Sequence, residues 1–181
     1  MKTFYVNLND GSSMKTTVID EASHVDSCLT ELILSCNYNS AWPFLIALDV
    51  NFKKPNTDHI ETLQLATRTR CLILQLHKMK ANLPQSLQNL LSANLFCFVG
   101  VRMQESLFMI GQEYGLYCRN SYELGPALMY LAAQIGDLEV EEKLSSGIVS
   151  SAAANLTKEE IESSVYAVRG MYEIGCLHCY S

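Results

Sequence analysis

The chain of 181 residues lacks any apolar run that approaches the roughly twenty residues needed to span a bilayer. Its first residues, Met1 to Met14, contain neither the apolar core of a secretory signal nor an Arg-rich amphipathic stretch. We therefore expect an intracellular protein, located in the cytoplasm, the nucleus or both, that is not secreted and has no membrane partner.

Positive charge is also scarce. Thirteen Lys and Arg residues stand against nineteen Asp and Glu residues, which gives a net charge of −6. Such a charge repels a phosphate backbone unless the basic residues gather on one face. The composition therefore predicts weak nucleic-acid binding or none.

Residues arranged for zinc, redox or nucleophilic chemistry are missing as well. The seven Cys residues are an odd number spread through apolar runs, which is typical of a reduced protein without disulfides. The pair Cys176 and Cys179 has CxxC spacing, but no second pair completes a zinc site, and this pair ends a predicted helix where a redox pair would begin one. The four His residues are dispersed, so the sequence does not favour a Cys–His or Ser–His enzyme.

What the chain does have is enough apolar sequence for one sizeable core, since 49% of its residues are hydrophobic. We interpret residues 1–181 as a single domain. The stretch Phe44–Val50 is apolar except for Asp49, which is typical of a strand buried on both faces of a sheet. A carboxylate there either binds metal, takes part in catalysis or caps backbone amides, or it is an ordinary strand-end Asp exposed to water.

The remaining patterns predict an α/β fold. Alternating residues around a Gly-containing turn indicate a hairpin over Thr3–Asp20, antiparallel to the Phe44–Val50 strand. Farther on, strands alternate with helices, which requires crossover connections and some parallel pairing. Thr157 and Glu160 form a capping box that begins the last helix. The other predicted helices run from Val25 to near Cys36, and over Leu83–Leu91, Glu105–Tyr114 and Leu124–Ile135. The other predicted strands are Ile60–Ala66, Cys71–Leu76 and Phe96–Val101. Gly136–Asn155 is the least structured stretch.

This layout, three antiparallel strands followed by parallel strands with helices on both faces, is that of the ribonuclease H-like fold. Several short motifs occur in the order and at the spacing of one family with that fold. Over nearly its whole length the chain resembles the exonuclease domain of the Werner-type 3′–5′ exonucleases of the DEDD superfamily, especially the small stand-alone plant forms. The motifs are Leu48–Val50, Glu61–Thr67, Arg70–Leu76, Phe98–Val101, Tyr114–Leu116 and Tyr172–Gly175.

The resemblance implies hydrolysis by two Mg²⁺ or Mn²⁺ ions held by four carboxylates, with a Tyr that orients water. The first family Asp matches Asp49. The Glu two residues later matches Asn51, and the Asp after the Phe-Val-Gly strand matches Ser106. The Tyr and the Asp of the last helix match Ser163 and Ala167. One carboxylate of four is kept, so we expect no intact catalytic site, no metal and no cofactor.

We therefore interpret the chain as a catalytically inactive exonuclease-like domain that acts as a protein-interaction or regulatory module. Its partner is an unidentified protein, an active relative or a second copy of the chain. The alternatives are a nucleic-acid-binding protein and a residual metal-dependent exonuclease. In the family, Lys53 and Lys54 would lie beside the substrate strand and could contact phosphates, or they are ordinary solvated loop charges.

Overall fold

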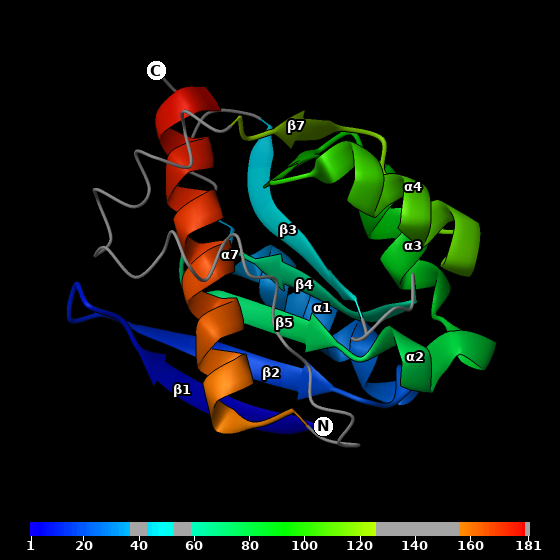
Figure 1. The fold of residues 1–181 in the computed structure, drawn as a ribbon, viewed down its shortest axis with the longest axis horizontal. Helices are drawn as coiled ribbons and strands as arrows, with labels where there is room; N and C mark the ends of the chain where they lie inside the picture. The colour runs from blue at the N-terminus through cyan, green and yellow to red at the C-terminus, as the bar shows by residue number, and fades with distance from the viewer. Residues whose placement is uncertain (37–42, 53–58, 126–155, 180–181) are drawn as a thin grey trace.

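The computed structural model describes residues 1–36, 43–52, 59–125 and 156–179 (Figure 1). Its centre is a seven-stranded sheet with the order β1-β2-β5-β4-β3-β6-β7. The strands are β1 (Lys2–Asn7), β2 (Ser13–Ile19), β3 (Phe44–Phe52), β4 (Ile60–Ala66), β5 (Arg70–Leu74), β6 (Phe96–Gly100) and β7 (Ser121–Glu123). The helices are η1 (Ala22–His24), α1 (Val25–Leu34), α2 (Leu76–Met79), η2 (Lys80–Asn82), α3 (Gln85–Ser92), α4 (Met103–Tyr114) and α7 (Lys158–Cys179).

Strand directions confirm the mixed α/β sheet. Strands β3, β4 and β5 are antiparallel to one another, whereas β6 and β7 continue the sheet in parallel with β3. The prediction for the hairpin was half wrong. β1 is antiparallel to β2, but β2 lies parallel to β5 and therefore runs in the same direction as β3. Helix α1 separates β2 from β3 in the chain, and the two strands are not neighbours in the sheet. The hairpin pairs with β5 instead, through β2, and sequence spacing does not reveal that choice.

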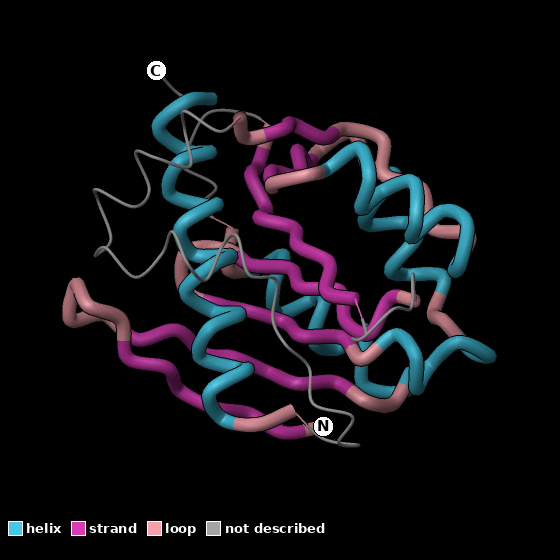
Figure 2. Tube along the Cα trace, in the orientation of Figure 1, coloured by secondary structure: helices cyan, strands magenta, loops and turns pink. Residues whose placement is uncertain are grey.

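Helices cover both faces of the sheet, as α7 crosses in front of it and α1 lies behind (Figure 1; Figure 2). Successive residues of β3 supply two separate cores because strand side chains alternate between faces. Leu48 and Val50 belong to the core shared with α1, α3 and α4, and Leu45 and Ala47 belong to the core beneath α7. Both cores contain fully buried side chains, which explains why β3 is apolar along nearly its whole length.

The last helix begins as predicted. The backbone N–H of Thr157 donates to Glu160 Oε2 at 2.6 Å, and the N–H of Glu160 donates to Thr157 Oγ1 at 3.2 Å. These two bonds form the expected capping box. From there α7 packs against β3, β4 and β6. At Gly175 an added Cβ would lie 2.8 Å from Val99 Cγ2, so the absence of a side chain lets the helix approach β6 closely.

Other boundaries differ slightly from prediction. β5 ends at Leu74 because Leu76 already begins the short helix α2. The three-residue strand β7 had not been predicted, since its side chains are largely exposed and its sequence shows no strand pattern. From residue 126 onwards, the predicted helix 124–135 and the stretch 136–155 lie outside the described residues. In the described part of the chain no helix is both long and apolar enough to cross a membrane.

Candidate functional site

Four polar side chains lie together on the face of the sheet that α7 covers. Asp49 and Asn51 alternate with core residues of β3 and share this face with Ala47, which belongs to the core under α7. Their cross-strand partners on β4 are Gln64, opposite Asp49, and Thr62, opposite Asn51. Opposite residues of an antiparallel pair place their side chains on the same face. We call Asp49, Asn51, Thr62 and Gln64 the polar row.

Asp49 is in an unfavourable place for a charge. Burial raises the pKa of Asp49 from its ordinary value of 3.8 to about 6, although the backbone N–H of Val50 and the positive charge of Arg102 act in the opposite direction. Because burial is the largest influence, the surroundings of Asp49 favour its neutral form more than water does.

Asn51 pairs across the sheet rather than along its own strand. Its amide nitrogen donates to Thr62 Oγ1 at 3.3 Å. The reason is geometric. Residues two apart on a strand lie about 7 Å apart along it, whereas directly opposite residues lie about 5 Å apart. Asn51 is 8% exposed and is thus a buried, partnered amide.

The two α7 positions lie on the helix that covers the polar row. Ser163 and Ala167 are four residues apart and therefore share one face of α7. Ser163 is half-buried and Ala167 is buried, while α7 itself packs against β3. The structure thus brings these two positions to the same side of the sheet as Asp49 and Asn51.

Ser106 lies on a helix that packs on the opposite face of the sheet from α7. This helix is α4, whose Met103 and Ile110 belong to the core on that face. α4 nevertheless contacts β3, and Ser106 is only 4% exposed. The predicted nucleic-acid contacts Lys53 and Lys54 lie outside the described residues, so their role stays a prediction.

Sequence reasoning missed the junction between β6 and α4. Arg102 has a left-handed backbone conformation, with φ of 55°, which costs a residue with a side chain about 1 kcal/mol. The carboxylate of Glu123 accepts the backbone N–H of Arg102 at 2.7 Å and that of Met103 at 2.5 Å. These bonds satisfy free donors at the start of α4 and offset the strain. The partners are about twenty residues apart in sequence, so no local pattern could have identified them.

Gln64 was missed for another reason. Its side chain is fully buried, and within the described part of the chain neither its amide oxygen nor its amide nitrogen has a hydrogen-bond partner. Each unpaired buried group typically costs about 1–3 kcal/mol. A Gln flanked by Leu63 and Leu65 in a fully buried strand was the available signal. The polar row therefore combines one unfavourable carboxylate with one unsatisfied amide.

The residues of the polar row do not fit a pair of Mg²⁺ or Mn²⁺ ions. Such ions take several oxygen ligands, with carboxylates to balance their charge. Here Asp49 is the one acid of the row, and Asn51 directs its amide nitrogen to Thr62. The charge that acts on Asp49, that of Arg102, is positive. Among the described residues, no three His, Cys, Asp or Glu side chains gather closely enough to hold a metal ion.

Replacing Asp49 by Asn should stabilise the fold at neutral pH. The native state binds the Asp49 proton more tightly than the unfolded chain does, so native stability falls as the pH rises from about 4 to about 6 and then levels off. Asp49→Asn removes this titration. We expect its gain in unfolding free energy over the natural protein to grow across that interval, to at most about 3 kcal/mol at pH 7. Urea unfolding at pH 4.5 and 7 measures the difference, and a gain that is equal at both values contradicts the prediction.

The order and directions of the strands, with helices on both faces, define the ribonuclease H-like fold of 3′–5′ exonuclease domains. Two kinds of solved structure share it. The EXD2 exonuclease domain soaked in Mn and GMP is 19% identical, with a TM-score of 0.53, and the match covers 92% of this chain and 91% of that one. The RNase D of Trypanosoma brucei in complex with GMP is 13% identical, with a TM-score of 0.66, over 88% of this chain and 55% of that one.

These likenesses show the fold, and they agree with the resemblance inferred from the sequence motifs. This chain corresponds to about half of the RNase D chain and to nearly all of the EXD2 domain. No protein-family profile and no curated protein matches the sequence. We therefore infer the function from the site residues of this chain rather than from the proteins that share its fold.

Proposed function

We propose that this chain is a catalytically inactive exonuclease-like domain that acts as a protein-interaction or regulatory module. The observation that carries the proposal is the set of residues at the five positions where the family holds its metals and orients water. They offer Asp49 as a carboxylate and four neutral side chains. Three of these neutral side chains, Asn51, Ser106 and Ala167, are buried.

Electrostatics supports the same conclusion. Two divalent ions bring four positive charges, and a single carboxylate compensates poorly for the water those ions must lose. Arg102 already supplies positive charge near Asp49. The EXD2 exonuclease domain has been solved after soaking in Mn or in Mg, and we propose that this chain binds neither ion.

A domain that keeps an exonuclease fold without the metal-binding side chains can still act by binding another molecule at its surface. A protein partner fits the net charge of −6 better than a phosphate backbone does. The partner is an unidentified protein, an active relative or a second copy. The nucleic-acid-binding alternative depends on Lys53 and Lys54 and stays a prediction.

The proposal is tested by an exonuclease assay on the purified protein. We expect no digestion of single-stranded or recessed double-stranded DNA with Mg²⁺ or Mn²⁺, because the ligands of a two-metal site act as a unit. Products are resolved on a denaturing gel. Asp49→Ala serves as the control for a contaminating nuclease. Metal-dependent digestion that disappears in Asp49→Ala would show a residual enzyme.

A further inference from the structure

The free edge of β1 offers unpaired backbone groups. The N–H of Lys15 donates to Thr69 O at 3.1 Å, and Ile19 O accepts from the N–H of Gln75 at 2.9 Å. The odd-numbered residues of β2 therefore direct their backbone groups towards β5. Their opposite residues on β1 are Thr3 and Tyr5, whose backbone groups must then face away from the sheet. In the described part of the chain no strand lies beyond β1.

This edge has few of the features that prevent pairing. β1 is six residues long, contains no Pro and has one charged residue, Lys2, while Tyr5 is 71% exposed. Proteins commonly protect free edges with charges, Pro or bulges, because an unprotected edge adds another strand readily. An extended peptide that pairs with such an edge gains backbone hydrogen bonds, and side-chain pockets give it specificity.

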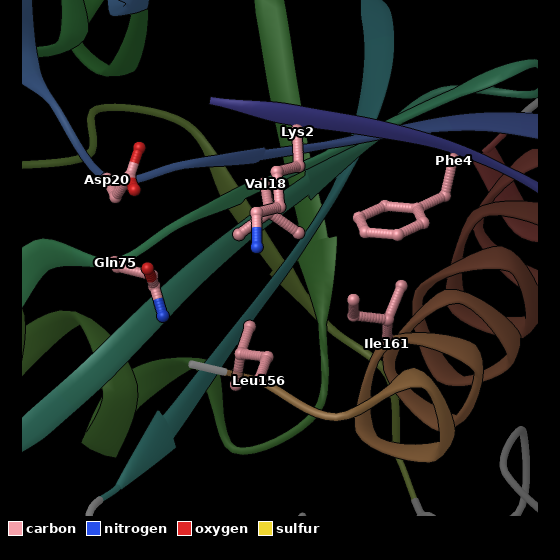
Figure 3. Close-up of a pocket in the computed structure, with 7 residues that line it drawn as sticks. All are labelled: Lys2, Phe4, Val18, Asp20, Gln75, Leu156 and Ile161. Carbon is pink, nitrogen blue, oxygen red and sulfur yellow. The ribbon is translucent and has the colours of Figure 1, made fainter. Parts of the chain in front are cut away.

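A small pocket lies beside this edge, between the sheet and the start of α7 (Figure 3). Its volume of about 50 Å³ is far below that of a typical cofactor site of about 300 Å³ or more, but it suits the end of one aliphatic side chain. Its apolar part consists of Phe4, Val18, Leu156 and Ile161, and its polar part consists of Lys2, Asp20 and Gln75.

The polar part of the pocket favours a carboxylate. Lys2 extends its ammonium group over Val18 into the pocket (Figure 3). Gln75 is only 3% exposed and uses its oxygen to accept from Lys78 Nζ at 2.9 Å, so its amide nitrogen remains as a donor (Figure 3). Asp20 is engaged by the amino group of Met1 at 2.6 Å. Of these groups, Lys2 belongs to the edge strand β1 itself and is the cation that an acid on an added strand would meet.

We propose that β1 binds an extended segment of a partner protein as an added antiparallel strand with the pattern apolar-any-acidic. Lys2 and Phe4 are two residues apart and lie on the same face of β1, towards α7. An antiparallel segment places its apolar residue opposite Phe4 and, two residues later, its acidic residue opposite Lys2. Opposite charges and aromatic–aliphatic pairs are the favourable cross-strand combinations. This proposal rests on the proposed function, because it identifies the surface that an interaction module would use.

The test uses fluorescein-labelled peptides and fluorescence polarisation with the full chain. The probe is the nine-residue peptide Thr-Val-Thr-Leu-Thr-Glu-Thr-Ser-Thr, and a matched peptide carries Lys in place of Glu. We expect the Glu peptide to bind the natural protein more tightly. Lys2→Glu should weaken the Glu peptide about tenfold and reverse the preference, because an attractive cross-strand pair becomes a repulsive one. Arg119→Glu, an exposed charge change away from β1, should leave the affinity within about twofold.

A second pair of variants tests the backbone contacts. Tyr5→Pro removes the outward N–H while edge strands tolerate Pro, so binding of the Glu peptide should fall at least about tenfold. Tyr5→Thr keeps the N–H and should bind as the natural protein does. Circular dichroism and thermal melting establish that each variant is folded.

Several outcomes overturn the proposal. It fails if no binding is seen up to millimolar protein, if the Glu and Lys peptides bind equally, or if Tyr5→Pro binds as tightly as Tyr5→Thr. It also fails if sedimentation shows a dimer that Tyr5→Pro dissociates, because the occupant of the edge is then a second copy. Each of these outcomes leaves the exonuclease assay unaffected, so failure of this proposal and failure of the proposed function are distinguishable.

Discussion

The quadruple variant Asn51→Glu, Ser106→Asp, Ser163→Tyr and Ala167→Asp is expected to digest single-stranded DNA from its 3′ end in Mg²⁺ or Mn²⁺, and the natural protein is expected not to. The four changes put three carboxylates and a Tyr at the positions that match those of the exonuclease family. We expect a change from no detectable product to measurable turnover. Denaturing gels of a 5′-labelled oligonucleotide measure it.

The reverted residues should also show their effect in stability. Asn51, Ser106 and Ala167 are each no more than 8% exposed, so three added acids crowd like charges into a buried place and should lower the melting temperature without metal. Millimolar Mn²⁺ should then raise it by several degrees, because an ion that binds only the folded state stabilises that state. The natural protein should change little with Mn²⁺.

Partial reversions are the controls for this experiment. Each single reversion should remain inactive, since the ligands act together and their effects are strongly non-additive. Adding Asp49→Ala to the quadruple variant should abolish its activity. If the folded quadruple variant binds no Mn²⁺ and digests nothing, the five positions do not form one site, and the motif alignment that defines them is wrong.

The sequence predicted best where a local pattern determines the structure. The Phe44–Val50 strand is central because its residues are apolar on both faces, and the capping box begins α7 because Thr157 and Glu160 satisfy each other's backbone donors. The direction of β2 depends on which side of β5 the hairpin joins, and β7 is held by pairing with β6. Both are long-range choices that neighbouring residues do not encode.

Sequence periodicity determines which face some candidate residues share, but not the contacts that they make. Alternation along β3 correctly places Asp49 and Asn51 on one face, and the helical period places Ser163 and Ala167 on one side of α7. Which residue opposes Asn51 depends on the register between β3 and β4. In that register Thr62 lies opposite Asn51 and accepts its hydrogen bond, and Gln64 lies opposite Asp49. The cap that Glu123 supplies to α4 likewise requires β7 to be in place.

Replacing Gly100 by Ala is expected to destabilise the protein by about 3 kcal/mol or more. Gly100 ends β6 just before the turn into α4. An added Cβ would lie 2.3 Å from the backbone oxygen of Leu48 and 2.6 Å from Met103 Sδ. The Met103 side chain can move, but the Leu48 oxygen belongs to the central strand β3. The strands must therefore separate at the point where α4 begins.

Gly170→Ala is the matched control for Gly100→Ala. Gly170 lies within α7, and nothing stands within 4 Å of an added Cβ there. Ala in a helix interior is favoured over Gly, so this variant should gain about 0.5–1 kcal/mol. Urea unfolding followed by circular dichroism measures both variants on the same scale. A Gly100→Ala protein as stable as the natural one would mean that β6 and β3 do not approach each other this closely, and the connection that places Arg102 near Asp49 would then have to be different.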